Sequence, residues 1–296
     1  MMKFLPIVPI LLLISFAGSV LAETDSACVR NAGGAVITAA HDTNMVTDVN
    51  GNNGLACKEA PDFYRIKFYR FGMCKSNPLL NAINDFSNCS YLVDSDAGVS
   101  HVLSYPSTAV LDTNSAIAPG TYSHLLLILN NGLEQMHTET FSRTMTGTTG
   151  TGTTCWTVNK KTTYGGNTLA GTVAPDISDR NTLAMECGAT AAAAYTTEIF
   201  DTMGCGSPPC FNASSISAQA HVELLTSDNV TIATTAVNAV RIAVVMPLAK
   251  TILADSTFDI GFKVVGSTSV DLAHASGTTY VKKVGADPFQ VTLTVK

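Results

Sequence analysis

Apolar and polar side chains alternate most regularly in two parts of the chain. In residues 63–71, Arg65 and Lys67 alternate with aromatic and aliphatic side chains, and in residues 289–295 polar residues alternate with apolar ones. A period of two residues is typical of a β-strand with one buried face and one face in water. Both segments are therefore predicted to be strands.

From residue 216 onward the pattern predicts one strand after another, separated by turn-forming sequences such as residues 227–229 and 285–288. The predicted strands cover residues 218–225, 237–246, 258–265, 270–273, 278–284 and 289–295. Short strands at this spacing favour an antiparallel sandwich over a βαβ fold.

A β-hairpin is predicted in the N-terminal half. Residues 122–129 and 133–141 read as strands, and Asn131 and Gly132 lie between them. Both residue types tolerate positive φ, which a two-residue hairpin turn requires.

The middle of the chain departs from the strand pattern. Residues 144–154 alternate Thr with Gly and predict a flexible tip or linker. Residues 190–203 include a run of alanines and are followed by Gly204, so they predict a short helix.

The sequence thus predicts a mainly β protein, an antiparallel β-sandwich with two β regions, a disulfide-containing middle insertion and one short helix. The predicted division is a signal peptide over residues 1–22, an N-terminal β region over 23–146, a Thr/Gly-rich and Cys-containing insertion over 147–212, and a C-terminal β-sandwich region over 213–296.

The first 22 residues have the pattern of a cleavable signal peptide. Lys3 precedes an apolar run over residues 4–20, and small residues lead to a cleavage position after Ala22. A transmembrane anchor, the alternative, needs about 20 predominantly apolar residues, and Pro6 and Pro9 fit a removed segment better. We expect a secreted, periplasmic or cell-surface protein without a membrane span after the signal is removed.

Eight cysteines follow the signal, and an even number in an exported chain indicates disulfides. They are Cys28, Cys57, Cys74, Cys89, Cys155, Cys187, Cys205 and Cys210. Eight cysteines allow about 105 connectivities, and pairing each with its sequence neighbour is the simplest. A zinc site is the alternative, but the chain has no Cys-x-x-Cys and no finger spacing.

Charge narrows the range of partners. The formal net charge is −6, only 14% of residues are charged, and no Lys/Arg cluster occurs. Nucleic acids and anionic membrane surfaces are bound through such clusters, so neither is an expected partner.

One segment resembles a calcium loop. Asp48, Asn50, Asn52 and Glu59 place oxygen donors at positions 1, 3, 5 and 12 of such a loop. Asn53 replaces the usual glycine, a cysteine lies inside the loop, and a proline follows it. A plain Asn/Gly-rich turn is the alternative.

Other candidate chemistry is sparse. In the predicted hairpin, Leu126 faces His137 and His124 faces Glu139, which brings the two histidines close enough to bind a metal or titrate together. Solvent-facing polar positions are the alternative. No nucleophile elbow, P-loop or dinucleotide fingerprint occurs.

Three aromatic residues, Tyr64, Tyr69 and Trp156, are candidates for a carbohydrate platform. The alternative for each is packing in the protein core.

The Pro119-Gly120-Thr121-Tyr122 turn into an apolar strand, together with the alternating strand 289–295, resembles secreted transthyretin-like and immunoglobulin-like β-sandwich domains. The chain is also similar to exported proteins of aquatic bacteria whose activity is uncharacterised. Neither resemblance implies a functional residue here.

These observations favour a non-enzymatic secreted or cell-surface structural protein, a subunit of a self-assembling filament or surface layer whose partners are copies of itself or other surface proteins. An extracellular glycan- or ligand-binding module is the first alternative, and a secreted hydrolase with a site assembled in space is the second.

Overall fold

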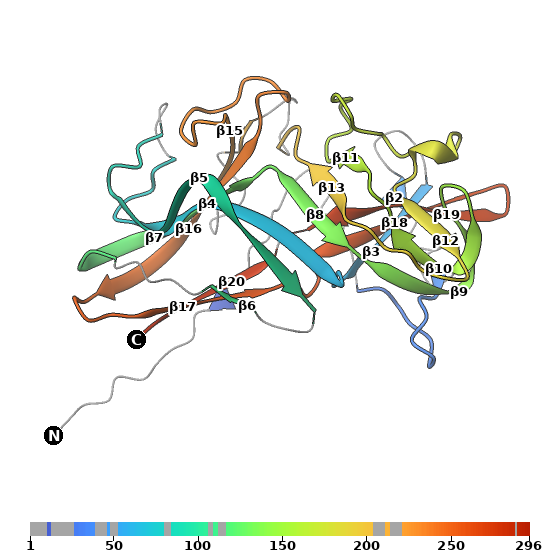
Figure 1. The fold of residues 1–296 in the computed structure, drawn as a ribbon, viewed down its shortest axis with the longest axis horizontal. Coiled ribbons are helices and arrows are strands. Elements are labelled where there is room, and N and C mark those ends of the chain that lie inside the picture. The colour runs from blue at the N-terminus through green and yellow to red at the C-terminus, as the bar shows by residue number, and fades with distance from the viewer. Residues whose placement is uncertain are drawn as a thin grey trace.

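The computed structural model describes residues 11–12, 27–38, 46–47, 53–79, 84–105, 109–111, 117–203, 211–213, 221–287 and 289–296. The protein is mainly β, and the strands of these residues form three sheets (Figure 1). The predicted fold class, a mainly β protein with disulfides, is confirmed. The only helix that lies wholly within the described residues is the short 3-10 helix Arg180–Thr182.

The largest sheet has nine strands. Its order is β11 (Lys161–Thr163), β13 (Thr196–Ile199), β8 (Gly132–Met136), β4 (Phe63–Cys74), β7 (Gly120–Asn130), β16 (Arg241–Ile252), β15 (His221–Leu225) and β14 (Asn212–Ala213), with β5 (Cys89–Ser104) on the other edge of β4.

The other two sheets have seven and four strands. The seven-stranded order is β12 (Met185–Gly188), β10 (Thr151–Thr157), β9 (Thr138–Thr146), β19 (Thr278–Ala286), β18 (Thr268–Ala275), β3 (Asn53–Glu59) and β2 (Val46–Thr47). The four-stranded order is β1 (Leu11–Leu12), β20 (Gln290–Val295), β17 (Phe258–Lys263) and β6 (Ala109–Leu111).

The nine-stranded and four-stranded sheets pack face to face, with β17, β20 and β6 beneath β4 and β7 in Figure 1. Phe262 of β17 contacts Phe68 and Phe71 of β4, with ring centroids 5.1 and 6.3 Å apart. Tyr64 and Phe289 make a similar contact at 5.8 Å. These aromatic side chains form the centre of the largest hydrophobic core, because both sheets turn an apolar face toward it.

The alternation predicted for residues 63–71 is confirmed in β4. Tyr64, Ile66 and Phe68 are fully buried, whereas Arg65 and Lys67 are half-buried. The neighbouring strand β7 instead has five consecutive buried residues, 125–129. A central strand covered on both faces shows such a continuous apolar run.

The predicted hairpin is wrong. β7 and β8 run one after the other along the same edge of β4, where Phe68 pairs with Leu129 and Tyr64 pairs with Gln135. Neither Asn131 nor Gly132 has a positive φ, so the chain continues instead of turning.

The side chain of Asn131 explains why the chain goes straight on. It is 2% exposed, its amide donates to the carbonyl oxygens of Phe200, at 2.7 Å, and Ala239, and its oxygen accepts the N–H of Phe200 at 3.0 Å. One side chain therefore satisfies backbone groups from two neighbouring segments. Tertiary hydrogen bonds, not turn formation, account for this Asn.

The helix predicted over residues 190–203 is also wrong. Residues 196–199 form strand β13, which pairs with β8 and β11, and no helix occurs here. Glu198 of this strand is buried, accepts the N–H of Ala286 at 2.6 Å and pairs with Lys283. Burial by itself would lower the pKa of Lys283, but Glu198 and Asp271 together raise it above its ordinary value. These pairings override the helix propensity of the alanines.

Strands from the three predicted regions share sheets. β10 of the predicted insertion lies between β12 of the same insertion and β9 of the N-terminal region, and β9 lies beside β19 of the C-terminal region. The six predicted C-terminal strands are all present, but they are distributed over all three sheets instead of forming a sandwich of their own.

The predicted flexible Thr/Gly tip is a fixed turn between β9 and β10. The carboxylate of Glu186 accepts the N–H groups of Thr149, at 2.9 Å, and Gly150. A Cβ on Gly150 would lie 2.2 Å from the carbonyl oxygen of Cys187, so only glycine fits against this strand.

Three disulfides join the cysteine neighbours that the sequence analysis pairs: Cys28–Cys57, Cys74–Cys89 and Cys155–Cys187. Two of them link directly opposite residues of adjacent strands, β4 with β5 and β10 with β12. Cys205 and Cys210 lie outside the described residues. The three disulfides indicate an oxidising environment.

Within the described part of the chain, no helix is long and apolar enough to cross a membrane.

Replacing Asn131 tests its bridging role. Asn131→Ala leaves buried backbone groups of Phe200 and Ala239 unpaired, so we expect the free energy of unfolding to fall by about 2–5 kcal/mol. Urea unfolding measures this free energy.

Asn130→Ala is the matched control, because Asn130 makes one hydrogen bond, to the carbonyl of Gly132, from a half-buried position. We expect it to lower the free energy by only about 0.5–1.5 kcal/mol. Equal effects would contradict the bridge.

Candidate functional site

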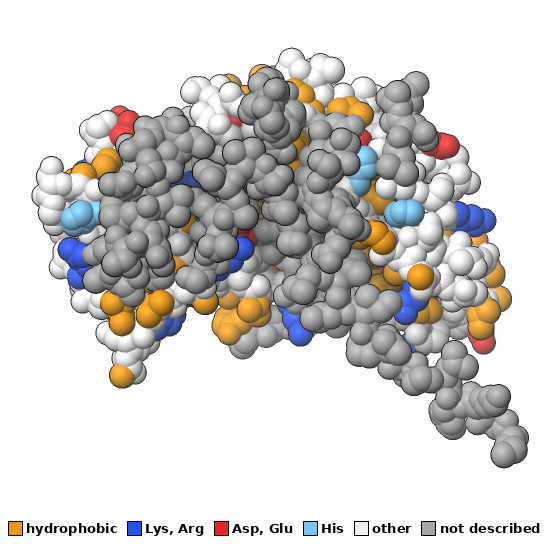
Figure 2. All heavy atoms as spheres, turned by 180° about the vertical axis from the view of Figure 1, so that it is seen from behind, with side chains coloured by type: hydrophobic (Ala, Val, Ile, Leu, Met, Phe, Trp, Pro, Cys, Tyr) orange, Lys and Arg blue, Asp and Glu red, His pale blue; other side chains and the backbone are white. Residues whose placement is uncertain are grey.

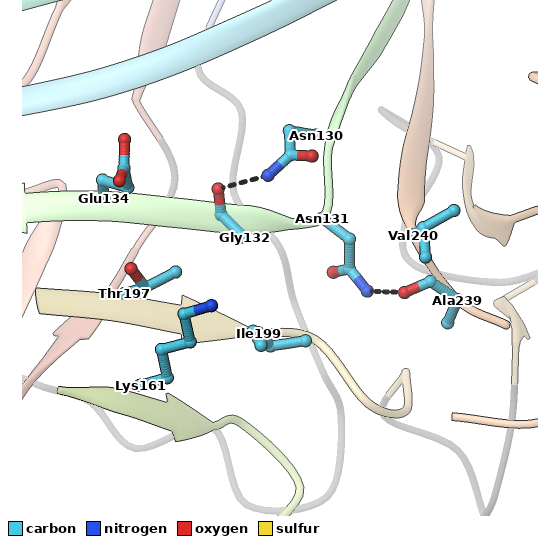
Figure 3. A pocket seen from close by; sticks show the side chains of 9 residues that line it. All are labelled: Asn130, Asn131, Gly132, Glu134, Lys161, Thr197, Ile199, Ala239 and Val240. Atoms are coloured by element: carbon cyan, nitrogen blue, oxygen red, sulfur yellow. Dashed lines mark hydrogen bonds between the residues drawn. The ribbon is translucent and has the colours of Figure 1, made fainter. Parts of the chain in front are cut away.

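A surface hollow of about 260 Å³ lies where β7 passes into β8 (Figure 3). It is lined by Asn130, Asn131, Gly132, Glu134, Lys161, Thr197, Ile199, Ala239 and Val240. Glu134 pairs with Arg65 at 3.1 Å, and the amide of Asn131 is held by its backbone partners. Lys161 is the only cation in the lining. The hollow has room for a small polar molecule, but no nucleophile lies beside a base in its lining.

An ion pair between Arg30, whose side chain is 35% exposed, and the buried Glu139 holds the N-terminal segment against the seven-stranded sheet. The guanidinium of Arg30 donates to both carboxylate oxygens of Glu139, at 2.9 and 2.7 Å, and lies 2.6 Å from an oxygen of Glu59. Nε2 of His137 is 3.5 Å from the Glu139 carboxylate. Burial by itself would raise the pKa of Glu139, but His137 and Arg30 together lower it below its ordinary value.

This ion pair bears on the calcium hypothesis. Glu59, one of its four candidate ligands, already has a guanidinium at its carboxylate. Asp48, Asn50 and Asn52 lie outside the described residues. A calcium ion at Glu59 would have to compete with Arg30.

The two histidines of the predicted hairpin belong to different environments. His124 lies in β7 opposite Cys74 and Pro247, and its Nδ1 is 2.7 Å from Oγ of Ser123. His137 is buried beside Glu139, beyond the end of β8. The hairpin register that would bring the two together does not exist.

The three candidate aromatic residues do not form a carbohydrate platform. Tyr64, Tyr69 and Trp156 are 0%, 4% and 7% exposed. Each packs in the protein interior, as the alternative interpretation holds.

Another buried carboxylate, which the sequence analysis missed, lies on β15. Glu223 is fully buried and accepts a hydrogen bond of 2.7 Å from the amide of Asn84, which also donates to the carbonyl of Val230. Nε2 of His221 is 3.5 Å from the same carboxylate. The His-x-Glu spacing places both side chains on one face of a strand, and that spacing is the signal that could have indicated the pair.

Neither carboxylate site is a metal centre of the usual kind. Among the described residues, no group of three or more His, Cys, Asp and Glu side chains is arranged to hold a metal ion. In the described part of the face in Figure 2, Lys and Arg side chains lie scattered among uncharged ones.

The edges of the sheets are the remaining candidates for a functional surface. Most described edge strands are two to four residues long: β1, β2, β6, β11, β12 and β14. β5, by contrast, has 16 residues, and Val99 and Val102 on it are 40% and 51% exposed. Such an edge offers unpaired backbone groups to another strand.

Comparisons with protein-family models, curated proteins and solved structures find no match to this chain.

The pH dependence of stability tests the Arg30–Glu139 pair. Because the pKa of Glu139 is lowered in the folded protein, its contribution is present above the ordinary pKa, near 4.5, and is lost as the pH falls through the folded-state value. We expect the free energy of unfolding to drop less steeply below pH 4.5 in Glu139→Gln than in the wild type. Urea unfolding from pH 6 to about pH 3 measures it.

Glu134→Gln is the matched control. Glu134 pairs with Arg65 at a position where both side chains are about one-third exposed. Exposed pairs contribute about 0–1 kcal/mol, so the slope of this variant should follow that of the wild type. Identical slopes in Glu139→Gln and the wild type would show that the Arg30–Glu139 pair contributes nothing to acid stability.

Proposed function

We propose that this chain is a non-enzymatic structural protein of the cell surface or extracellular space, exported with loss of residues 1–22, that assembles with copies of itself. The observation that carries the proposal is that the buried carboxylates are bonded to other groups of the same chain. Glu139, Glu198 and Glu223 are each bonded to other groups of the same chain. Asp201 is bonded in the same way, to the N–H groups of Gly165 and Asn167.

These carboxylates join segments that are distant in the sequence. Glu139 holds the N-terminal segment on β9, Glu198 joins β13 to β19, and Glu223 joins β15 to the loop that contains Asn84. A carboxylate that serves in catalysis must reach a substrate. Groups committed to cross-links support a structural role instead.

The disulfides support the same role. Each closes onto a strand of the sheets, and an exported protein exposed to an oxidising medium keeps such bonds. Disulfides between strands resist local unfolding, which suits a protein with a structural role. The burial of Tyr64, Tyr69 and Trp156 weighs against the glycan-binding alternative.

Assembly is tested on native and purified material. We expect electron microscopy of the native cell surface to show an ordered polymer that antibodies against this chain decorate. The purified chain without residues 1–22 should increase in mass with concentration in analytical ultracentrifugation. A monomer at every concentration, together with a surface free of any polymer of this chain, would contradict the proposal.

A further inference from the structure

Lys283 of β19 lies beside a buried carboxylate that comes from another sheet. Its Nζ contacts Oε1 of Glu198 on β13, and the two residues are 85 positions apart in the sequence. The side chain of Lys283 is 15% exposed and that of Glu198 is 3% exposed. An amine and a carboxylate are thus held in contact between the seven-stranded and the nine-stranded sheet, where water has little access.

The other buried carboxylates described above are bonded to groups of a different chemical kind. Glu139 is bonded to a guanidinium, Glu223 to a side-chain amide, and Asp201 to backbone N–H groups and a side-chain amide. A guanidinium stays protonated and an amide nitrogen is not a nucleophile, so neither attacks a carboxyl group. A lysine amine is a nucleophile once it has lost a proton. The pair of Lys283 and Glu198 therefore has the chemistry to form a covalent bond.

Two further groups lie at the pair. The backbone N–H of Ala286 donates to Oε2, the second oxygen of Glu198, at 2.6 Å. A donor in this place stabilises negative charge that develops on the oxygen, as in an oxyanion hole. Asp271 lies directly opposite Lys283 on β18, and its Oδ2 is 4.0 Å from Nζ of Lys283. This distance is longer than a hydrogen bond, and such contacts in a resting site shorten as a proton moves.

We propose that the side chains of Lys283 and Glu198 condense into an amide, and that this isopeptide bond joins β19 of the seven-stranded sheet covalently to β13 of the nine-stranded sheet. In this reaction the N–H of Ala286 stabilises the reacting carboxyl group, and Asp271 is the base. The inference goes beyond the proposed function, because the reaction takes place within one chain and requires no second copy.

The reaction consumes no other reactant and returns Asp271 unchanged. Nζ first passes one proton to Oε1 across their contact, which leaves a neutral amine beside a neutral carboxylic acid. The amine then attacks Cδ of Glu198, and Asp271 takes a second proton from Nζ as the N–C bond forms. Asp271 passes this proton to the Oε1 hydroxyl, the bond between Cδ and Oε1 breaks, and one water leaves. Oε2 becomes the oxygen of the amide and keeps the N–H of Ala286 as its donor.

Burial and contact favour the amide over the ion pair. The ion pair keeps two charges out of water, which costs free energy, whereas the amide is uncharged. Two reacting groups held in the right geometry behave as if at an effective concentration of about 10⁵–10⁸ M. Burial by itself would lower the pKa of Lys283, but Glu198 and Asp271 raise it above its ordinary value, so the ammonium form predominates and the bond forms slowly. Each chain has to form it only once.

Mass spectrometry of the unfolded chain tests the proposal. After reduction of the disulfides, we expect the purified chain to weigh one water less than the sequence it contains, because an amide, unlike an ion pair, persists on unfolding. A tryptic digest should contain a branched peptide in which the segment with Glu198 is joined to Lys283. A chain with the full mass of its sequence, from which both segments are recovered as linear peptides, would overturn the proposal.

The ion pair of Lys296 and Asp259 is a control within the same digest. These two side chains also contact each other, but they are 54% and 49% exposed. Because water surrounds them and no packing holds their geometry, we expect linear peptides from both. A branched peptide at this exposed pair would show that amides form wherever a lysine meets a carboxylate, which contradicts a site built by burial.

Two variants separate the covalent bond from the ion pair. Lys283→Arg keeps a positive charge beside Glu198 but has no amine, so this variant should have the full mass of its sequence. Lys296→Arg is the matched control and should weigh one water less, as the wild type does. Asp271→Asn keeps both reacting groups and removes the base. When a chain that is produced unfolded is refolded, we expect this variant to form the bond about a hundredfold more slowly than the wild type, since a general base contributes about 10²–10⁴-fold.

The outcomes separate this inference from the proposed function. A missing water in Lys283→Arg would place the bond elsewhere and contradict the assignment to Lys283. Bond formation at the wild-type rate in Asp271→Asn would contradict the role of Asp271 as the base. A linear chain that still assembles overturns this inference and leaves the proposed function standing, whereas a cross-linked chain that stays monomeric does the reverse. The mass of the wild-type chain decides the main point whether or not a variant folds.

Discussion

The pairing of β4 with two successive strands on the same edge determines how the rest of the chain is arranged. β7 pairs with the second half of β4 and β8 pairs with its beginning, so a single extended segment runs along the length of β4. Asn131 lies at the junction and bonds the backbone of Phe200 and Ala239. Beyond this segment, β16 and β15 extend the sheet from β7, and β13 and β11 extend it from β8. A turn at Asn131 would take β8 away from β4, and with it the strands β13 and β11.

Two ion pairs, each with a buried carboxylate, join segments that are distant in the sequence. Glu198 and Lys283 link β13 of the nine-stranded sheet to β19 of the seven-stranded sheet, and Arg30 links the N-terminal segment to β9. Burying a charge costs free energy unless an opposite charge lies beside it. If one member of such a pair is removed, the other remains buried without a partner, and the folded protein is destabilised. These pairs therefore favour the arrangement in which their segments meet. This role accounts for the buried carboxylates of Glu139 and Glu198 without a catalytic one.

The lengths and sequences of the edge strands bear on assembly. Most described edges are too short to accept another strand, and β5 is acidic and irregular, whereas β20 is regular and uncharged beneath β1. A sheet edge is a binding site only while it is free.

What the sequence by itself determined is local. Strand alternation in residues 63–71, the six C-terminal strands and the pairing of neighbouring cysteines all depend on side-chain period or on short separations along the chain, and the structure contains each of them.

The tertiary structure alone decided how the strands combine. Asn131-Gly132 has the residues of a tight turn, and residues 190–203 have helix-forming alanines, yet both are extended because hydrogen bonds to Phe200 and an ion pair to Lys283 stabilise them there. His221 and Glu223 carried a signal in their spacing, but their partner Asn84 comes from a loop more than a hundred residues earlier. Local propensity differs by at most about 1 kcal/mol per residue for most residue types, so contacts between distant segments decide wherever a buried polar group needs a partner.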